Sequence, residues 1–333
     1  MSQDLSALVV RPSNGGNGHE LQFGQIQKPP SEPMNAAACE GGVLGCDFVG
    51  TVEELGAKVT RYKTGDIVAG LIWGSEVEGR GAFGYYTVAD ENISFKVPEG
   101  FALEKAATVP LASAAAWLAL FSKDSLGIPM RSDSAISVLI WGGSSSVEQY
   151  AIQIAASHGF NVITTCSPKY FETVKSLGAR HVFDYHDQDV ATKIKGASST
   201  IHYAFDTIGQ KQSSATASHA LARSGETLSA LCTVRPGKAN TEDVVKGVKV
   251  TDVLVWTAFL KDHRYGEFFW PASDFDHEIC VDFFKKLPGW LRDGQLRASV
   301  PSLKHGLDSV ADGFQEYRDG KISGYKLVYR IHE

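Results

Sequence analysis

The sequence has few of the features that mark disulfide frameworks or metal lobes. Its cysteines are an odd number, lie far apart and form no C-x-x-C pair. They are Cys39, Cys46, Cys166, Cys232 and Cys280. This spacing argues against a disulfide framework and against a four-cysteine zinc lobe. Reduced thiols in a cytoplasmic protein fit the pattern best.

Long apolar runs and an excess of positive charge are also lacking. No run approaches the length of a membrane span, and Met1 to Val10 lacks the layout of a signal peptide. A net charge of −6 and a pI near 5.9 argue against nucleic acid or an anionic membrane as partner. What is present is an ordinary globular composition, 43% hydrophobic and 21% charged, in 333 residues. This length predicts two domains.

A short run of small residues follows the most apolar stretch. Residues 135–141 predict a buried strand, and a helix is expected to begin near Val147. The loop before that helix consists of Gly142, Gly143, Ser144, Ser145 and Ser146. Glycine lets the backbone approach an anion closely, and the first turn of a helix offers unpaired N–H groups. The loop therefore predicts a phosphate cradle, although Glu148 stands at the usual third glycine of G-x-G-x-x-G. The alternative is a plain strand–helix connection with an N-cap serine.

The residues after the loop predict a βαβ unit. An apolar helix leads into a second strand at 161–166. NAD-binding units carry an acid near the end of that strand, where it accepts hydrogen bonds from the ribose. Here the strand end reads Cys166, Ser167, Pro168, Lys169 and Tyr170. A serine and a lysine without an acid favour a 2′-phosphate, so the predicted cofactor is NADPH. A solvated surface lysine is the alternative reading of Lys169.

Further strand and helix patterns alternate to residue 256. Strands are predicted at 180–185, 201–208, 225–231 and 248–256, with a helix at 212–222. Repeated βα units imply an α/β fold with a doubly wound parallel sheet. Asp206 lies at the carboxyl edge of that sheet, where a turn or cap role is favoured over that of a catalytic acid.

The N-terminal part has a different pattern. Residues 1–44 appear irregular, whereas short strands with turn signals follow in 50–56, 65–70 and 81–88. Gly50 to Gly56 forms a G-x-V-x-x-x-G pattern, and Gly65 to Val68 reads G-D-x-V. These motifs resemble the β-rich domain of the medium-chain dehydrogenase/reductases, and the resemblance spans nearly the whole chain.

Within that superfamily, three segments resemble the fungal trans-acting enoyl reductases, which are separate proteins that serve polyketide synthases. The segments are 45–48, 141–147 and 166–170. The resemblance implies a Rossmann NADPH-binding domain at 113–290. It also implies a discontinuous GroES-like domain at 1–112 and 291–333, whose closing strand lies in 321–328.

The resemblance also implies site residues. Tyr185 would stack near the adenosine phosphate, Leu231 and Cys232 would lie beside the nicotinamide, and Ser323 and Gly324 would contact the cofactor. Two groups would line the substrate channel. The first consists of Ser113, Ala114, Ala115 and Trp117, and the second of Val255, Trp256, Thr257, Ala258 and Phe259. Core packing is the alternative for both channel groups, and half-buried packing is the alternative for Tyr185.

No metal is expected. Zinc-dependent relatives place Gly-His-Glu where this chain has Gly45-Cys46-Asp47. The histidine is missing, and no nearby cluster of histidine or cysteine supplies the remaining ligands. Cys46 is then a small buried apolar residue.

The implied chemistry is delivery of a hydride from NADPH to the β-carbon of an α,β-unsaturated thioester, with protonation at the α-carbon. No single side chain need be indispensable, because the cofactor supplies the reactivity and the protein supplies orientation and stabilisation of the enolate oxygen. Catalytic residues are therefore not assigned. A stand-alone NADPH quinone or enone reductase and a catalytically impaired binding relative are the alternative functions.

Two departures from the family pattern bear on that choice. Lys28 to Leu44 is too short for a strand and a lysine-bearing loop that relatives carry there, so the first domain is expected to be shortened. Glu148 could place a carboxylate roughly 5 Å from a pyrophosphate, which would cost on the order of 3 kcal/mol at an effective dielectric of about 20. The S-x-x-E spacing of Ser145 and Glu148 also fits a capping box.

Overall fold

The computed structural model describes residues 7–11, 43–74, 80–131, 135–222, 228–234, 242–265 and 268–331. The chain divides into two compact units. The first unit comprises Met1–Leu111, Phe284–Arg292 and Ala298–Glu333. The second unit comprises Ala112–Phe283 and Asp293–Arg297. The first domain is expected to be shortened between Lys28 and Leu44, and all but the last two residues of this segment lie outside the described residues.

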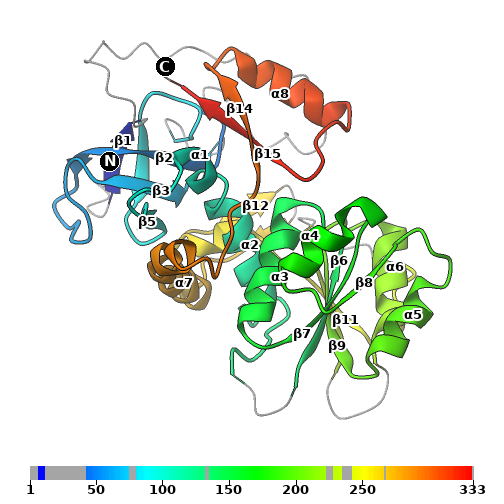
Figure 1. Ribbon diagram of the computed structural model, residues 1–333. Helices are drawn as coiled ribbons and strands as arrows, with labels where there is room; N and C mark the ends of the chain where they lie inside the picture. The colour runs from blue at the N-terminus through cyan, green and yellow to red at the C-terminus, as the bar shows by residue number, and fades with distance from the viewer. Residues whose placement is uncertain are drawn as a thin grey trace. The chain divides into compact units, whose positions relative to one another are not determined.

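The first unit contains an antiparallel sheet of five strands in the order β4-β1-β2-β3-β5 (Figure 1). Its strands are β1 (Ala7–Arg11), β2 (Asp47–Leu55), β3 (Ile67–Leu71), β4 (Thr87–Asp90) and β5 (Ser94–Lys96). Alternate residues of β2 are buried, as expected of a strand with one face on a core. The β-rich fold predicted from the turn signals is confirmed, although residues 81–86 lie outside the strands. Residues 7–11, expected to be irregular, instead form β1, which pairs with β2 and β4.

The C-terminal part of the first unit adds a second, smaller sheet. Strands β14 (Pro301–His305) and β15 (Lys326–Arg330) pair in parallel and are joined through α8 (Ser309–Arg318). Gly313 lets α8 approach β15 closely, because a Cβ at this position would overlap the Tyr329 hydroxyl. The closing strand predicted within 321–328 corresponds to β15, which begins at Lys326.

The second unit is built on six parallel strands in the order β11-β10-β9-β6-β7-β8. They are β6 (Ser137–Trp141), β7 (Asn161–Thr165), β8 (His181–Phe183), β9 (Ile201–Asp206), β10 (Ala230–Thr233) and β11 (Lys249–Asp252). The helices are α2 (Pro110–Phe121), α3 (Ser146–Ser157), α4 (Phe171–Ser176), α5 (Val190–Ala197) and α6 (Lys211–Ala220). The predicted doubly wound sheet is confirmed, and all five residues of β6 are buried, as for a central strand.

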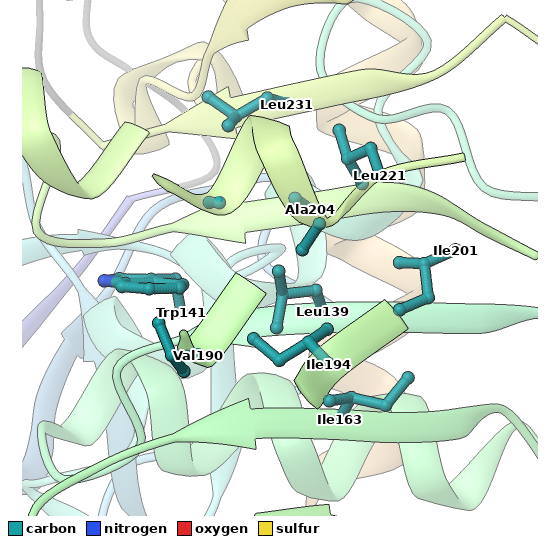
Figure 2. Packing of buried hydrophobic residues seen from close by; sticks show 11 residues of the cluster. Leu139, Trp141, Ile163, Val190, Ile194, Ile201, Ala204, Leu221 and Leu231 are labelled. Carbon is teal, nitrogen blue, oxygen red and sulfur yellow. The ribbon is translucent and has the colours of Figure 1, made fainter. Parts of the chain in front are cut away.

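Helices cover both faces of this sheet, with α3 and α4 on one side and α5 and α6 on the other (Figure 1). Apolar residues of α5 and α6 pack against the strands in a cluster that includes Trp141 at the end of β6 (Figure 2). The strands contribute Leu139, Ile163, Ala204 and Leu231 to this cluster. This packing fixes the carboxyl ends of the strands, where the candidate site lies.

Two predicted strands differ from the structure. The strand predicted at 248–256 ends at Asp252, and Val255–Ala258 forms a short 3₁₀ helix, η3. There the Thr257 N–H donates to the Leu254 carbonyl at 3.1 Å, a local 3₁₀ bond that replaces strand pairing. The strand predicted at 225–231 is β10, which begins at Ala230, and residues 225–227 lie outside the described chain.

The remaining elements are a hairpin and a long helix. Strands β12 (His263–Tyr265) and β13 (Phe268–Trp270) pair antiparallel. Helix α7 (Asp274–Arg292) continues through Pro288, so the predicted domain boundary at 290/291 falls inside a helix. The residues of α7 up to Phe283 belong to the second unit, and those from Phe284 belong to the first. Among the described residues, no helix combines the length and apolarity that crossing a bilayer requires.

Candidate functional site

The strand order of the second unit defines a switch point. From β6 the chain moves outward through β7 and β8, and then returns to the other side of β6 to form β9 and β10. Ligands of open α/β sheets bind outside the carboxyl ends of the strands where this reversal occurs. The crevice is therefore expected between the β6–α3 loop and the β9–α6 loop.

The β6–α3 loop, which we call the glycine loop, comprises residues 142–145. Gly142 has a φ of +85°, a conformation that favours glycine. A Cβ on Gly143 would lie 2.9 Å from the Thr164 hydroxyl oxygen, so the loop lies against β7. The Gly142 N–H donates to the Thr165 hydroxyl at 3.0 Å, and the Thr164 hydroxyl donates to the Gly142 carbonyl at 3.2 Å. Both glycines thus allow the close packing that shapes the loop.

Helix α3 begins at Ser146, one residue before the predicted start. Its N-cap, Ser145, is exposed, and the Ser145 N–H donates to a carboxyl oxygen of Glu148 at 2.5 Å. The intrahelical bonds start with the Gln149 N–H, which donates to the Ser145 carbonyl at 3.0 Å. The N–H groups of Ser146 and Val147 precede this bond and can therefore donate hydrogen bonds to an anion. The capping box predicted from S-x-x-E is present, and in it the Glu148 carboxyl accepts from the N–H of the N-cap residue.

Glu148 itself lies inside the protein. It is 2% exposed, and its second carboxyl oxygen accepts a hydrogen bond from the Thr207 hydroxyl in the β9–α6 loop. Burial raises the pKa of Glu148, and the hydrogen bonds from Thr207, Ser145 and Ser144 oppose that rise. The side chain therefore does not turn outward to solvent. Sequence reasoning found the capping partner but missed Thr207, which is 59 residues away in the chain.

Asp206, the last residue of β9, has a structural role in this geometry. It is fully buried, and its carboxyl accepts hydrogen bonds from the N–H groups of Ile208 and Gly209 and from the hydroxyls of Ser213 and Ser214. These partners fix the β9–α6 loop on the start of α6. The turn or cap role favoured by the sequence is confirmed.

The predicted adenosine-binding residues come from the ends of β7 and β8. These strands are neighbours, and the Cys166 N–H donates to the Phe183 carbonyl at 3.0 Å. Residues 168–170 form a short 3₁₀ helix, η2, on which the Lys169 ammonium lies 4.9 Å from the centre of the Tyr170 ring. Pro168 and Lys169 are exposed, whereas Ser167 and Tyr170 are half-buried.

Tyr185 follows β8 and is 45% exposed. Its ring lies 4.0 Å from that of His186, and His186 Nδ1 lies 2.7 Å from a carboxyl oxygen of Asp184. Interactions with His186 lower the pKa of Asp184. Sequence reasoning missed His186, because a histidine in a turn after a short strand carries no signal of its own.

The residues predicted to lie beside the nicotinamide have buried side chains. Leu231 belongs to the cluster in Figure 2, and Cys232 is fully buried on the opposite face of β10. Burial raises the pKa of Cys232 to about 12. Only the main chain at the end of β10 is therefore available for contact with a ligand.

The first group of predicted substrate residues lies on α2. Ser113, Ala114 and Trp117 are fully buried, and Ala115 is 8% exposed. Trp117 stacks on Phe283 with ring centres 4.6 Å apart. These contacts favour the packing interpretation of the helix.

The second group forms η3 and its flanks. Ala258 is fully buried, whereas Val255, Trp256, Thr257 and Phe259 are half-buried. The Thr257 hydroxyl lies 2.6 Å from a carboxyl oxygen of Asp276 in α7, with no substrate required for that bond. Val255, Trp256 and Phe259 thus remain the candidates for contact with an apolar substrate.

The other predicted residues lie in the first unit. Ser323 is exposed and Gly324 has a φ of +75° in the turn before β15. Cys46 is half-buried, and Asp47 pairs with Lys326 at 2.6 Å. Within the described ranges, no three histidine, cysteine or acidic side chains are grouped so that they could hold a metal ion.

Two family models match the chain. Residues 8–99 match the alcohol dehydrogenase GroES-like domain, and residues 147–255 match the zinc-binding dehydrogenase model. A trans-enoyl reductase from Fusarium sp. (strain FN080326) is 36% identical over 98% of this chain and 95% of its own. A trans-enoyl reductase from Alternaria alternata is 31% identical over 88% of this chain and 85% of its own.

Solved structures show the same fold. The quinone oxidoreductase of Pseudomonas syringae pv. Tomato DC3000 superposes with a TM-score of 0.67 at 20% identity, covering 97% of this chain and 91% of that chain.

Proposed function

Since this chain belongs to the medium-chain dehydrogenase/reductase superfamily, we propose that it is a trans-acting enoyl reductase that uses NADPH. Its substrate would be the α,β-double bond of a polyketide thioester held on the carrier protein of a polyketide synthase. The observation that carries this proposal is the 36% identity to a trans-enoyl reductase across both units. The strand order of the second unit supports the proposal, because open α/β sheets bind dinucleotides at such a switch point.

Two glycines would let a pyrophosphate approach the main chain of the glycine loop closely. Gly142 and Gly143 present no side chain, and a Cβ on either would meet neighbouring atoms at less than 3.0 Å. The first-turn N–H groups of α3, beginning with Ser146 and Val147, would hold the pyrophosphate at the positive end of the helix. Exposed Ser145 leaves this end of the helix open to solvent.

The choice of NADPH rests on the groups at the ends of β7 and β8. Residues 166–170 contain no acid that would accept from the ribose hydroxyls, and exposed Lys169 offers a positive charge for a 2′-phosphate. Tyr185 presents an exposed ring beside them, from the end of the neighbouring strand. These features support NADPH over NADH.

When bound, NADPH would supply the hydride for the β-carbon of the enoyl thioester. The protein's contribution is to bind and orient the reactants and to exclude water. The main chain at the end of β10 would orient the nicotinamide, since the side chains of Leu231 and Cys232 are buried. Half-buried Val255, Trp256 and Phe259 would contact the acyl chain.

The test is turnover of an enoyl thioester. The purified chain is mixed with NADPH and a pantetheine or carrier-bound enoyl thioester, and the loss of NADPH absorbance is followed together with the mass of the product. A gain of two hydrogens in the acyl chain supports the proposal. No turnover of any such thioester would reject it. Turnover of small quinones alone would instead identify a stand-alone reductase, and no oxidation of NADPH by any substrate would identify a binding relative.

A further inference from the structure

We propose that Glu148 is a positioning residue for the dinucleotide, because its carboxyl joins the two loops that meet at the switch point. The inference rests on the proposed function, since it concerns how the same site holds its cofactor. Nothing in the cradle chemistry itself requires an acid at this position, where the dinucleotide-binding pattern has glycine.

The carboxyl makes one connection to each loop. One oxygen accepts from the Ser145 N–H at 2.5 Å, at the end of the glycine loop. The other accepts from the Thr207 hydroxyl in the β9–α6 loop. Since β6 and β9 are adjacent strands, this pair of bonds spans the switch point. One side chain thus links the two loops that follow these strands.

The glycine loop is shaped around this carboxyl. A Cβ on Gly142 would lie 2.6 Å from the Glu148 carboxyl oxygen that Thr207 contacts. The other side of the loop is tied to β7 by Thr164 and Thr165. Glu148 therefore links the glycine loop to the loop after β9, whereas these threonines link it to β7.

Burial disfavours the charged form of the acid, whereas the hydrogen-bond donors around it favour that form. The groups facing it are the Thr207 hydroxyl, the Ser145 N–H and hydroxyl, the Ser144 N–H and the buried thiol of Cys166, the residue after β7. None of these groups is a cation, and Asp206 beside Thr207 is itself an acid with its own donors. A neutral carboxyl can keep both ties, because its carbonyl oxygen accepts from N–H and its O–H can be shared with a hydroxyl. In that protonated form the link adds no negative charge beside a pyrophosphate.

The experiment compares dinucleotide affinities of four variants with that of the wild-type chain. E148A and T207V each remove the link, E148A/T207V removes both partners, and E148Q keeps a neutral group of the same length. The probe is NADPH, titrated by fluorescence at pH 7, with circular dichroism as the check that each variant is folded. E172A removes an exposed carboxylate on α4 and serves as the matched control.

Positioning predicts that E148A and T207V each weaken NADPH binding about tenfold, which corresponds to about 1.4 kcal/mol. The double variant should be no weaker than either single variant by more than about twofold, because both remove one shared link. E148Q should bind within about threefold of the wild-type chain, and E172A should match it. T207V keeps the inference testable if E148A does not fold.

Tighter or unchanged binding in E148A and T207V would overturn the inference, since it would mean that the acid only repels the cofactor. A loss in E148Q as large as that in E148A would also overturn it, because a neutral side chain would then fail as a link. A wild-type chain that binds neither NADPH nor NADH would instead reject the proposed function and the inference together. The affinity of the wild-type chain for NADPH and NADH thus distinguishes a failure of the inference alone from a failure of the proposed function.

Discussion

The ammonium of Lys326 lies 2.6 Å from one carboxyl oxygen of Asp47, although the two residues are 279 positions apart. The other oxygen of Asp47 accepts from the Leu111 N–H at 2.6 Å. Asp47 thereby connects the start of β2, the first turn of α2 and the first residue of β15 within the first unit. The same carboxylate thus holds three segments that are distant in sequence.

We expect D47A to lower the free energy of unfolding by about 2–3 kcal/mol, because it leaves a partly buried ammonium and an N–H without their acceptor. Urea denaturation followed by circular dichroism measures this loss. K321M removes an exposed ammonium that pairs with Asp319 and should leave the urea midpoint unchanged. Equal effects of D47A and K321M would show that the Asp47 contacts do not stabilise the first unit.

Gly142 provides a test of the glycine loop. G142A should destabilise the protein by roughly 2–4 kcal/mol, since it adds strain at a φ of +85° to a Cβ contact of 2.6 Å with Glu148. G159A is the control, because Gly159 has a φ of +77° but nothing within 4 Å of an added Cβ. It should cost only about 1–2 kcal/mol of strain. Similar losses in thermal or urea denaturation would mean that the loop yields to the added methyl group.

The buried acid predicts a pH dependence of stability. Burial raises the folded-state pKa of Glu148 above its ordinary value of 4.5, so the folded state binds its proton more tightly than the unfolded state. The stability that Glu148 contributes is therefore present below about pH 4.5 and decreases as pH rises toward the folded-state pKa. Unfolding free energies measured for the wild-type chain should fall with pH relative to those of E148Q.

The control for this measurement is E172Q, which alters an exposed carboxylate with an 87% accessible side chain. Its stability should follow that of the wild-type chain at every pH. A constant difference in unfolding free energy between the wild-type chain and E148Q from pH 4.5 to 9 would contradict the prediction. It would show that Glu148 has the same pKa in the folded and unfolded states.

Lys169 predicts the selectivity between the two nicotinamide cofactors. K169A should weaken NADPH binding about tenfold and leave NADH binding within about twofold, because only NADPH carries a 2′-phosphate. Fluorescence titrations with both cofactors measure the ratio. K175A, which removes an exposed lysine already paired with Glu172, should leave that ratio unchanged. If K169A weakened both cofactors equally, Lys169 would not read the 2′-phosphate.

Much of the second unit could be predicted from local pattern. The strand ending at Trp141, the start of α3 near Ser146 and the Ser145–Glu148 spacing all depend on residues close in sequence. The strand predicted to continue to Trp256 was wrong, because the chain enters the 3₁₀ turn of η3 after Leu254, and periodicity does not reveal its backbone bond from the Thr257 N–H. The role of Trp117 was equally hidden, since its stacking partner Phe283 is far along the chain.

The sequence by itself determined the order of strands and helices, the glycine loop and the absence of an acid after β7, because backbone propensity, capping and side-chain type act over a few residues. Only the tertiary structure decided what Glu148 does. Its link to Thr207 exists because β6 and β9 pair side by side, although β7 and β8 lie between them in the chain. Burial between these strands, which no local pattern encodes, raises the pKa of the carboxyl. The hydrogen bond with Thr207 gives this capping residue a second partner on the other side of the switch point.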